Sequence, residues 1–205
     1  MAAFFGNLRN VVIAGFVLAI GVAAIYVGCL KGDIDMAFWA FVTRWLHVAA
    51  GVMWIGLLWY FNFVQIPTMP KVPAELKGGV TGYIAPAALF WFRWAALATI
   101  VLGIGLASQS ASYTLSDALT LGLSGAPNTA ASLIGLGMYL GLIMGFNVWF
   151  VIWPNQQKAL NIAGKYPNLA ADEKAAAAKT AMIFSRINTM LSVPMLFCML
   201  AASHI

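Results

Sequence analysis

The chain has 205 residues and a net charge of +5, with 62% apolar residues, only 8% charged residues and a mean hydropathy of +0.88. A soluble domain carries about 25% charged residues, and a soluble fold of this composition would expose apolar patches and aggregate. The basic residues lie between apolar runs rather than on one polar face, which argues against nucleic-acid binding. We therefore expect an all-α integral membrane protein that forms a single helical domain over residues 1–205.

The apolar runs predict about five membrane-spanning helices, and the first two are followed by clear stop signals. The first covers residues 11–30; it resembles a signal peptide in its basic start but is long for a signal core, so we expect a retained helix. The second covers residues 45–64, with tryptophans suited to the membrane interface. Prolines at positions 67, 70 and 73 follow it, and residues 68–88 are expected to form a polar connector.

The remaining three spans are separated by two polar stretches. The third span covers residues 89–107, the fourth residues 131–153 and the fifth residues 182–203. Residues 108–130 are rich in serine, glycine and threonine and predict an external loop or a short interfacial helix. Residues 155–181 carry the AADEKAAAAK stretch, a strong helix former expected in water or among the lipid headgroups.

The basic residues predict the orientation of the helices in the membrane. If the chain crosses five times, nine lysines and arginines fall on one side and only Lys31 and Arg44 on the other. Basic loops stay in the cytoplasm, so we expect a cytoplasmic N-terminus and a periplasmic C-terminus in a bacterial inner membrane. The nine are Arg9, Lys71, Lys77, Arg93, Lys158, Lys165, Lys174, Lys179 and Arg186.

The chain has two histidines, and the predicted topology places both in the outer leaflet. His47 lies one turn inside the second span, and His204 lies at the outer end of the fifth. Two neutral imidazoles from different helices are a ligand set for a b-type haem, and an ionisable group inside a span is a functional candidate. Gly51, one turn from His47, would let a flat cofactor approach, and Arg44 could pair with a haem propionate.

Other interpretations of these residues remain open. Gly51 is equally suited to close helix packing, and His47 to a hydrogen bond with a neighbouring helix. The last span carries Met190, Met195 and Met199, whose thioethers would suit Cu(I), although methionines in such a chain more often fill space in the core.

Polar and thiol groups in the other spans are sparse. Asn62, Arg93, Asn147 and Arg186 fall towards the predicted cytoplasmic side, where they either hold the helices together or line a second polar pocket. The two cysteines, Cys29 and Cys198, are expected to be buried free thiols.

Three segments, in this order, resemble the membrane-embedded N-terminal domain of the bacterial cytochrome c-coupled urate oxidases. They are RWLHVAAGVMWIGLLWYFNFVQ at 44–65, FNVWFVIWPNQQK at 146–158 and SRINTMLSVPMLFCMLAASH at 185–204, and FWFRW at 90–94 matches as well. The second is the most specific, because an asparagine and two tryptophans before Pro-Asn-Gln-Gln are not ordinary membrane-helix residues.

The resemblance implies a multi-helix domain which, in full-length relatives, oxidises a purine and passes electrons to an attached cytochrome c. His47 and His204 fall on histidine positions of that pattern. The relatives' further histidines before and at the start of the third helix are missing here, and these 205 residues contain no CxxCH motif. We therefore expect a small redox or accessory subunit that works with other membrane subunits or a periplasmic cytochrome. A cofactor-free structural subunit and a stand-alone urate-oxidising enzyme are the alternatives.

Overall fold

The computed structural model describes residues 2–30 and 32–204, and this part of the chain is helical throughout its regular structure. Five helical segments within it are long and apolar enough to cross a membrane, as the sequence predicted. The chain divides into two compact units, residues 1–42 and residues 43–205. The prediction of one domain over residues 1–205 is not tested by this division.

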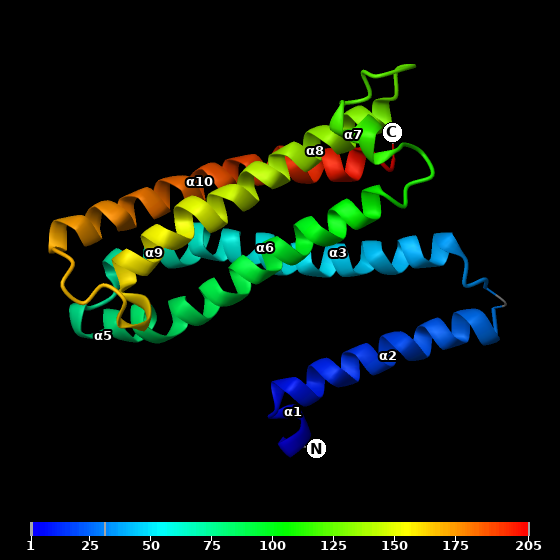
Figure 1. Ribbon diagram of the computed structural model, residues 1–205. Coiled ribbons are helices and arrows are strands. Elements are labelled where there is room, and N and C mark those ends of the chain that lie inside the picture. Colours follow the sequence, from blue (N-terminus) through cyan, green and yellow to red (C-terminus); the bar gives the residue numbers. More distant parts are fainter. Residues whose placement is uncertain (1, 31, 205) are drawn as a thin grey trace. The chain divides into compact units, whose positions relative to one another are not determined.

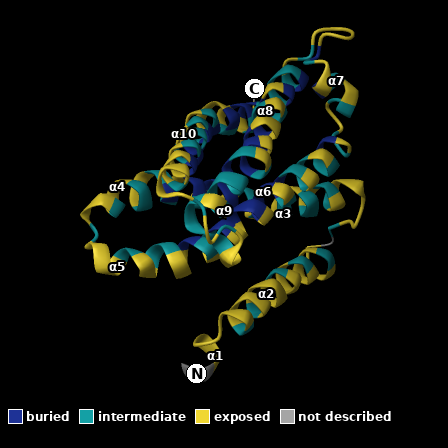
Figure 2. Ribbon diagram, turned by 60° about the vertical axis from the view of Figure 1, so that its left-hand side comes forward, coloured by how far each residue is buried: buried dark blue, intermediate teal, exposed yellow. Residues whose placement is uncertain are grey.

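The first unit contains α1 (Ala2–Phe5), α2 (Leu8–Gly28) and the first residues of α3 (Met36–Trp59). Asn7 caps α2 by accepting a hydrogen bond from the backbone of Arg9 at 3.0 Å. None of the described residues of α2 is buried, and Figure 2 shows the helix exposed or half-exposed along its length. Cys29, at its end, is exposed, so the prediction of a buried thiol is wrong for this residue and right for Cys198.

The second unit is a bundle of four helical columns. They are α3 with its continuation; α6 (Ala85–Ala107); α8 (Thr129–Phe146) with α9 (Trp153–Leu160); and α10 (Ala171–Ala201). Contacts link α3 to α6, α6 to α8, α8 to α10, and α10 back to the end of α3, which closes the bundle. The connections at 66–85 and 161–170 lie at one end of this unit, and residues 108–128 lie at the other (Figure 1).

The helices extend beyond the predicted spans mainly at one end. The column that contains α10 has 31 residues, about 46 Å at about 1.5 Å per residue, against a hydrocarbon core of about 30 Å. The AADEKAAAAK stretch forms the first turns of α10, which confirms it as helix. The polar connector predicted at 68–88 is wrong over most of its length, because α5 (Ala74–Gly79) runs through a π-helical segment into α6.

Three π-helical segments occur among the described residues, and each ends two residues before a proline. They are η1 (Tyr60–Gln65), η3 (Val80–Ile84) and η4 (Asn147–Ile152), followed by Pro67, Pro86 and Pro154. A proline has no N–H for the carbonyl four residues before it, and its ring crowds that carbonyl. In each segment the residue before the proline donates five residues back instead, for example Trp153 to Val148. The wider turn lets the column continue through the proline, where the sequence had predicted an end.

A short helix covers the end of the bundle opposite α5 and α9. This helix, α7 (Leu115–Leu119), begins at a capping box in which the Thr114 hydroxyl and the Asp117 carboxylate each bond the other's backbone N–H. The hydrogen bonds from the side chain and backbone of Thr114 lower the pKa of Asp117. Gly135 of α8 lies against the Ala118 carbonyl, where a side chain would have no room. The alternative of a short helix at 108–130 is therefore confirmed for residues 115–119.

The core of the second unit lies between the four columns and is built largely from aromatic and aliphatic side chains. Trp54 and Leu58 of α3 are 1% and 0% exposed, and both lie on the helical face that carries His47. Phe61 and Phe92 meet edge to face at 5.8 Å between ring centroids. Large exposed apolar side chains are common on the outer faces of the columns, as expected for surfaces that contact lipid.

Candidate functional sites

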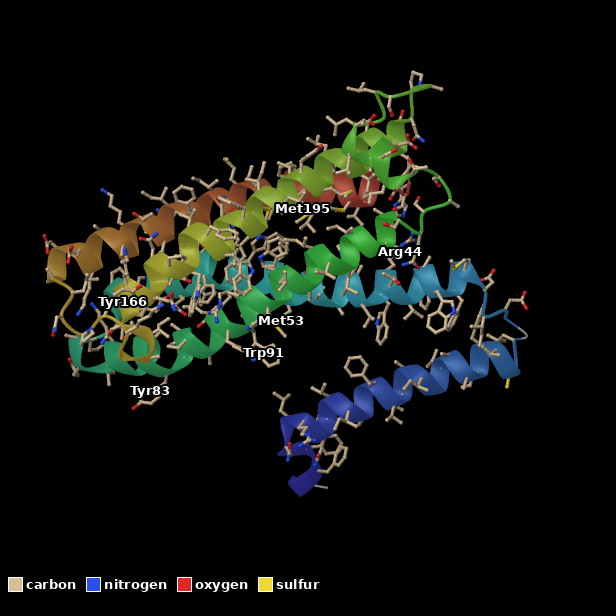
Figure 3. The ribbon with its side chains drawn as sticks, in the orientation of Figure 1. Arg44, Met53, Tyr83, Trp91, Tyr166 and Met195 are labelled. Carbon is tan, nitrogen blue, oxygen red and sulfur yellow. The ribbon has the colours of Figure 1, made fainter. Side chains whose placement is uncertain are left out.

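A partly open cavity of about 60 Å³ lies between the helices of the second unit, lined by residues from all four columns. His47 and Trp54 contribute from α3, and Thr99 and Gly103 from α6. Met138 of α8 and Met195 and Met199 of α10 supply three thioethers. Met195 points from α10 towards α6 (Figure 3) and is only 5% exposed. The cavity is therefore an apolar space whose Lewis bases are one imidazole and several sulfurs.

The imidazole of His47 is held by two features of α6. Its Nδ1 lies 2.9 Å from the backbone carbonyl of Thr99, and a carbonyl oxygen only accepts, so Nδ1 carries the proton. Neutral His47 then has its lone pair on Nε2. The ring lies over Gly103, where a Cβ atom would stand 2.9 Å from Cε1 of the imidazole. This arrangement, a ring N–H bound to a backbone carbonyl with the other nitrogen left over, is the usual support of a metal-ligating histidine.

The structure separates the other residues predicted for this site. His204 is exposed at the end of the chain, where its Nδ1 lies 2.8 Å from the carbonyl of Leu200, and it does not line the cavity with His47. Arg44 is exposed near the C-terminal end of α6 (Figure 3). Gly51 faces the methyl group of Thr99, with 3.8 Å between that methyl and the position of a Cβ. An alanine side chain would therefore fit at position 51, and neither the cofactor role nor the packing role of Gly51 is favoured by this contact.

The surroundings of His47 do not support a haem held between His47 and His204. Cofactor pockets usually measure about 300–1,000 Å³, several times the volume beside His47. The second histidine is also absent from the cavity lining. The predicted pairing of the two histidines therefore gains no support from their surroundings.

A second group of polar side chains lies towards the opposite end of the bundle and joins the columns by hydrogen bonds. Asn188 of α10 is fully buried; it accepts from the Asn147 amide at 2.9 Å and donates to the Met144 carbonyl at 3.0 Å. Asn62 donates to the Ser185 hydroxyl at 2.8 Å. The interpretation that Asn62 and Asn147 hold helices together is therefore correct.

Arg93 differs from these asparagines, because no described carboxylate forms an ion pair with it. Its side chain is 9% exposed; Nη1 donates to the Leu89 carbonyl at 3.0 Å, one turn back in α6. The guanidinium carbon lies 3.3 Å from the centre of the Trp153 ring, a cation–π contact. Its Nε is buried and has no hydrogen-bond partner among the described residues. A buried guanidinium with a free donor and no counter-charge is suited to an anion.

Three amide oxygens towards the same end also lack partners in the described part of the chain. They belong to Asn62 and Gln65 in η1 and to Gln156 in α9. Buried polar atoms are nearly always paired, so three such oxygens and the Arg93 Nε identify this end as a second candidate site. Arg186, which the sequence placed with these residues, is exposed.

Sequence patterns missed parts of both sites. Met138 was not recognised as a lining residue, and Met190, which was grouped with Met195 and Met199, is 64% exposed. The spacing on α10 was a usable signal: Met195 and Met199 are four residues apart and share a face, and Met190 does not lie on it. Gln65 and Gln156 were not predicted as site residues either, although each lies two residues from a proline that follows a π-helical segment.

Comparison with known families supports the resemblance in the C-terminal part of the chain. The family described as "Urate oxidase N-terminal" matches residues 113–205. This range contains two of the three segments named above, with Trp153, Gln156 and Asn188, but not the segment that contains His47. Neither curated proteins nor solved structures gave a match. Residues 113–205 thus resemble the N-terminal domain of urate oxidase, within a chain that carries five membrane-capable helices.

Proposed function

We propose that this protein binds a flat, anionic heteroaromatic compound of the purine type among the polar side chains around Arg93. The observation that carries the proposal is the buried guanidinium of Arg93, which lies against Trp153 and has no carboxylate partner in the described structure. A charge placed in an apolar bundle without a partner is costly, so a bound anion would offset that cost. We choose urate as the anion because residues 113–205 resemble the N-terminal domain of urate oxidase.

The chemistry of the other unpaired side chains towards the same end of the bundle agrees with such a ligand. Urate carries N–H donors, carbonyl acceptors and one negative charge near neutral pH. Amide groups such as those of Gln65 and Gln156 can serve either kind of partner, because their oxygen and nitrogen ends are interchangeable by rotation. The guanidinium lies over the Trp153 ring, and a planar cation pairs well with a planar anion.

The setting we propose is a bacterial inner membrane, with the C-terminus in the periplasm and the Arg93 site towards the cytoplasmic side. The excess of lysines and arginines in the connections at that end supports this orientation. We further propose that the chain is the ligand-binding subunit of a larger redox complex. Any electrons taken from the ligand would pass to a further redox carrier, such as a periplasmic cytochrome. A haem between the two histidines is no part of this proposal.

Equilibrium dialysis of the purified full chain in detergent against labelled urate tests the site. We expect one urate bound per chain. Arg93→Gln removes the charge while keeping a polar side chain, and we expect it to weaken binding at least about tenfold, since a buried charge contact contributes about 2 kcal/mol or more. Arg93→Lys should give a smaller loss, because it keeps the charge but not the planar contact with Trp153.

Arg186→Gln is the matched control, because it removes the same charge from an exposed position. It should bind urate within twofold of the unaltered chain (about 0.4 kcal/mol). Thermal unfolding of each variant confirms that the bundle is intact. A chain that binds no urate, or an Arg93→Gln variant that binds it normally, would overturn the proposal and favour a cofactor-free structural subunit.

A further inference from the structure

We propose that the cavity beside His47 is a binding site for a single Cu(I) ion. The ligands would be Nε2 of His47 and the thioether sulfurs of Met138, Met195 and Met199. The site is separate from the polar residues around Arg93, and the proposal does not rest on the function proposed above.

The donor set is the first argument. All three methionines line the one cavity that His47 lines, although they come from two different helices. Thioethers are soft ligands that select Cu(I), and imidazole binds copper well. Among the described residues, no group of three or more His, Cys, Asp or Glu could hold a metal ion, so this cavity lacks the ligands that zinc, magnesium or calcium prefer.

The second argument is the tautomer of His47 and the position of its ring. Nδ1–H of His47 donates a hydrogen bond to the Thr99 carbonyl, and Nε2 has no hydrogen-bond partner in the described structure. His47 is half-buried, which leaves the lone pair on Nε2 accessible to an entering ion. The ring is also set against Gly103, where any larger residue would displace it.

The size and surroundings of the cavity are the third argument. A space of about 60 Å³ exceeds the roughly 15 Å³ that one small guest requires, and it is far smaller than an organic cofactor needs. Four neutral ligands leave the charge of a monovalent ion uncompensated. Trp54, which is 1% exposed and lines the cavity, belongs to the residue type with the strongest cation–π attraction. A divalent ion of similar size would meet about four times the desolvation cost, because that cost rises with the square of the charge, without a carboxylate to offset it.

Competition with a coloured Cu(I) chelator, under anaerobic conditions and with the full chain in detergent, tests the site. The chain should remove one equivalent of Cu(I) from the chelator. Ag(I) should compete, because it is equally soft, and Zn²⁺ should not. X-ray absorption at the copper edge should show sulfur neighbours at about 2.3 Å and a nitrogen at about 2.0 Å, close to the values known for zinc.

Methionine-to-leucine variants separate ligands from core residues, because the two side chains have similar volumes and the exchange costs little stability. Met195→Leu and Met199→Leu should each weaken Cu(I) binding at least about tenfold, and His47→Gln should weaken it further. Met190→Leu is the matched control on the same helix, where the side chain is 64% exposed, and it should leave the affinity unchanged.

Two results would overturn the assignment. One is a full chain that takes no Cu(I) from the chelator while its thermal unfolding shows an intact bundle. The other is unchanged Cu(I) affinity in both Met195→Leu and Met199→Leu, which would place any bound copper elsewhere on the chain.

Discussion

Gly103 shows how a single missing side chain positions a functional one. A Cβ atom at this residue would lie 2.9 Å from Cε1 of His47, closer than real contacts allow. We expect Gly103→Ala to lower the free energy of unfolding by about 1–3 kcal/mol through overpacking and to reduce Cu(I) binding as the imidazole shifts. Chemical denaturation in mixed detergent gives the first quantity and chelator competition the second.

Gly105, two residues further along the same helix, is the control for this substitution. A Cβ there would lie 4.0 Å from the Thr43 methyl group, an ordinary contact. Gly105→Ala should therefore be neutral or stabilising by up to about 1 kcal/mol, from the better helix propensity of alanine. Equal effects of the two substitutions would show that the His47 ring does not depend on Gly103.

At the scale of single residues, the sequence predicted which face of a helix is buried better than it predicted which residues of other helices contact that face. Helical spacing placed Trp54 and Leu58 on the face of His47, and both are buried. Nothing in that spacing indicates which residues of other helices meet the same face, so the contribution of Met138 was missed. Cys29 was expected to be buried because apolar residues surround it in sequence, but α2 has no buried residue in this structure.

At the scale of elements, the prolines show where sequence rules stop applying. The sequence predicts that Pro67 and Pro86 belong to a break between two spans, since proline usually ends a helix in water. Within a membrane an open backbone carbonyl is more costly, so the chain keeps its helical bonds by widening the turn instead. The sequence could not distinguish these outcomes, because the same proline permits both.

Asn188 offers a test of how firmly two elements are joined. Its side chain links α10 to the Met144 carbonyl and to Asn147, through bonds of 3.0 and 2.9 Å. Asn188→Ala should lower the free energy of unfolding by about 1–2 kcal/mol, the upper range for hydrogen bonds between membrane helices. Steric trapping or denaturant unfolding in detergent measures this loss.

Met190→Ala serves as the reference for that experiment, because it shortens a side chain two residues away that is 64% exposed. We expect it to change the unfolding free energy by less than about 0.5 kcal/mol. If Asn188→Ala is no more damaging than this reference, the hydrogen bonds seen here contribute nothing net to the association of the helices.

At the scale of the whole molecule, hydropathy predicted the number of long helices but not how they pack. Apolar runs mark segments that can leave water, and all five are present. The outer and inner faces of such helices are almost equally apolar, so periodicity does not reveal which face meets a neighbour. For this reason neither the closed ring of four columns nor the position of the cavity could be predicted.

The charge distribution of the second unit yields a prediction about orientation. The connections at 66–85 and 161–170 carry lysines and lie at one end, and residues 108–128 at the other end contain only one charged residue, Asp117. A cysteine introduced as Ser124→Cys in a Cys29→Ser, Cys198→Ser background should react with a membrane-impermeant maleimide added outside bacterial spheroplasts. Lys165→Cys in the same background should react only after the membrane is opened.

Both cysteine variants carry the same two background substitutions, so differences in reactivity report on sidedness alone. Labelling of the cysteine at position 165 from outside, together with protection of the one at position 124, would reverse the orientation. It would also move the Arg93 site to the periplasmic half of the membrane.

The three widened turns have a consequence for the evolution of chain length. A π-helical turn holds one residue more than the α-helical turn it replaces, so each of η1, η3 and η4 is a point where a single residue can be lost without disturbing the columns on either side. Homologues that lack Pro67, Pro86 or Pro154 have no reason to keep the extra residue. Alignments of homologues with this chain should therefore show one-residue gaps at these three places, and gaps elsewhere in the columns should be rare.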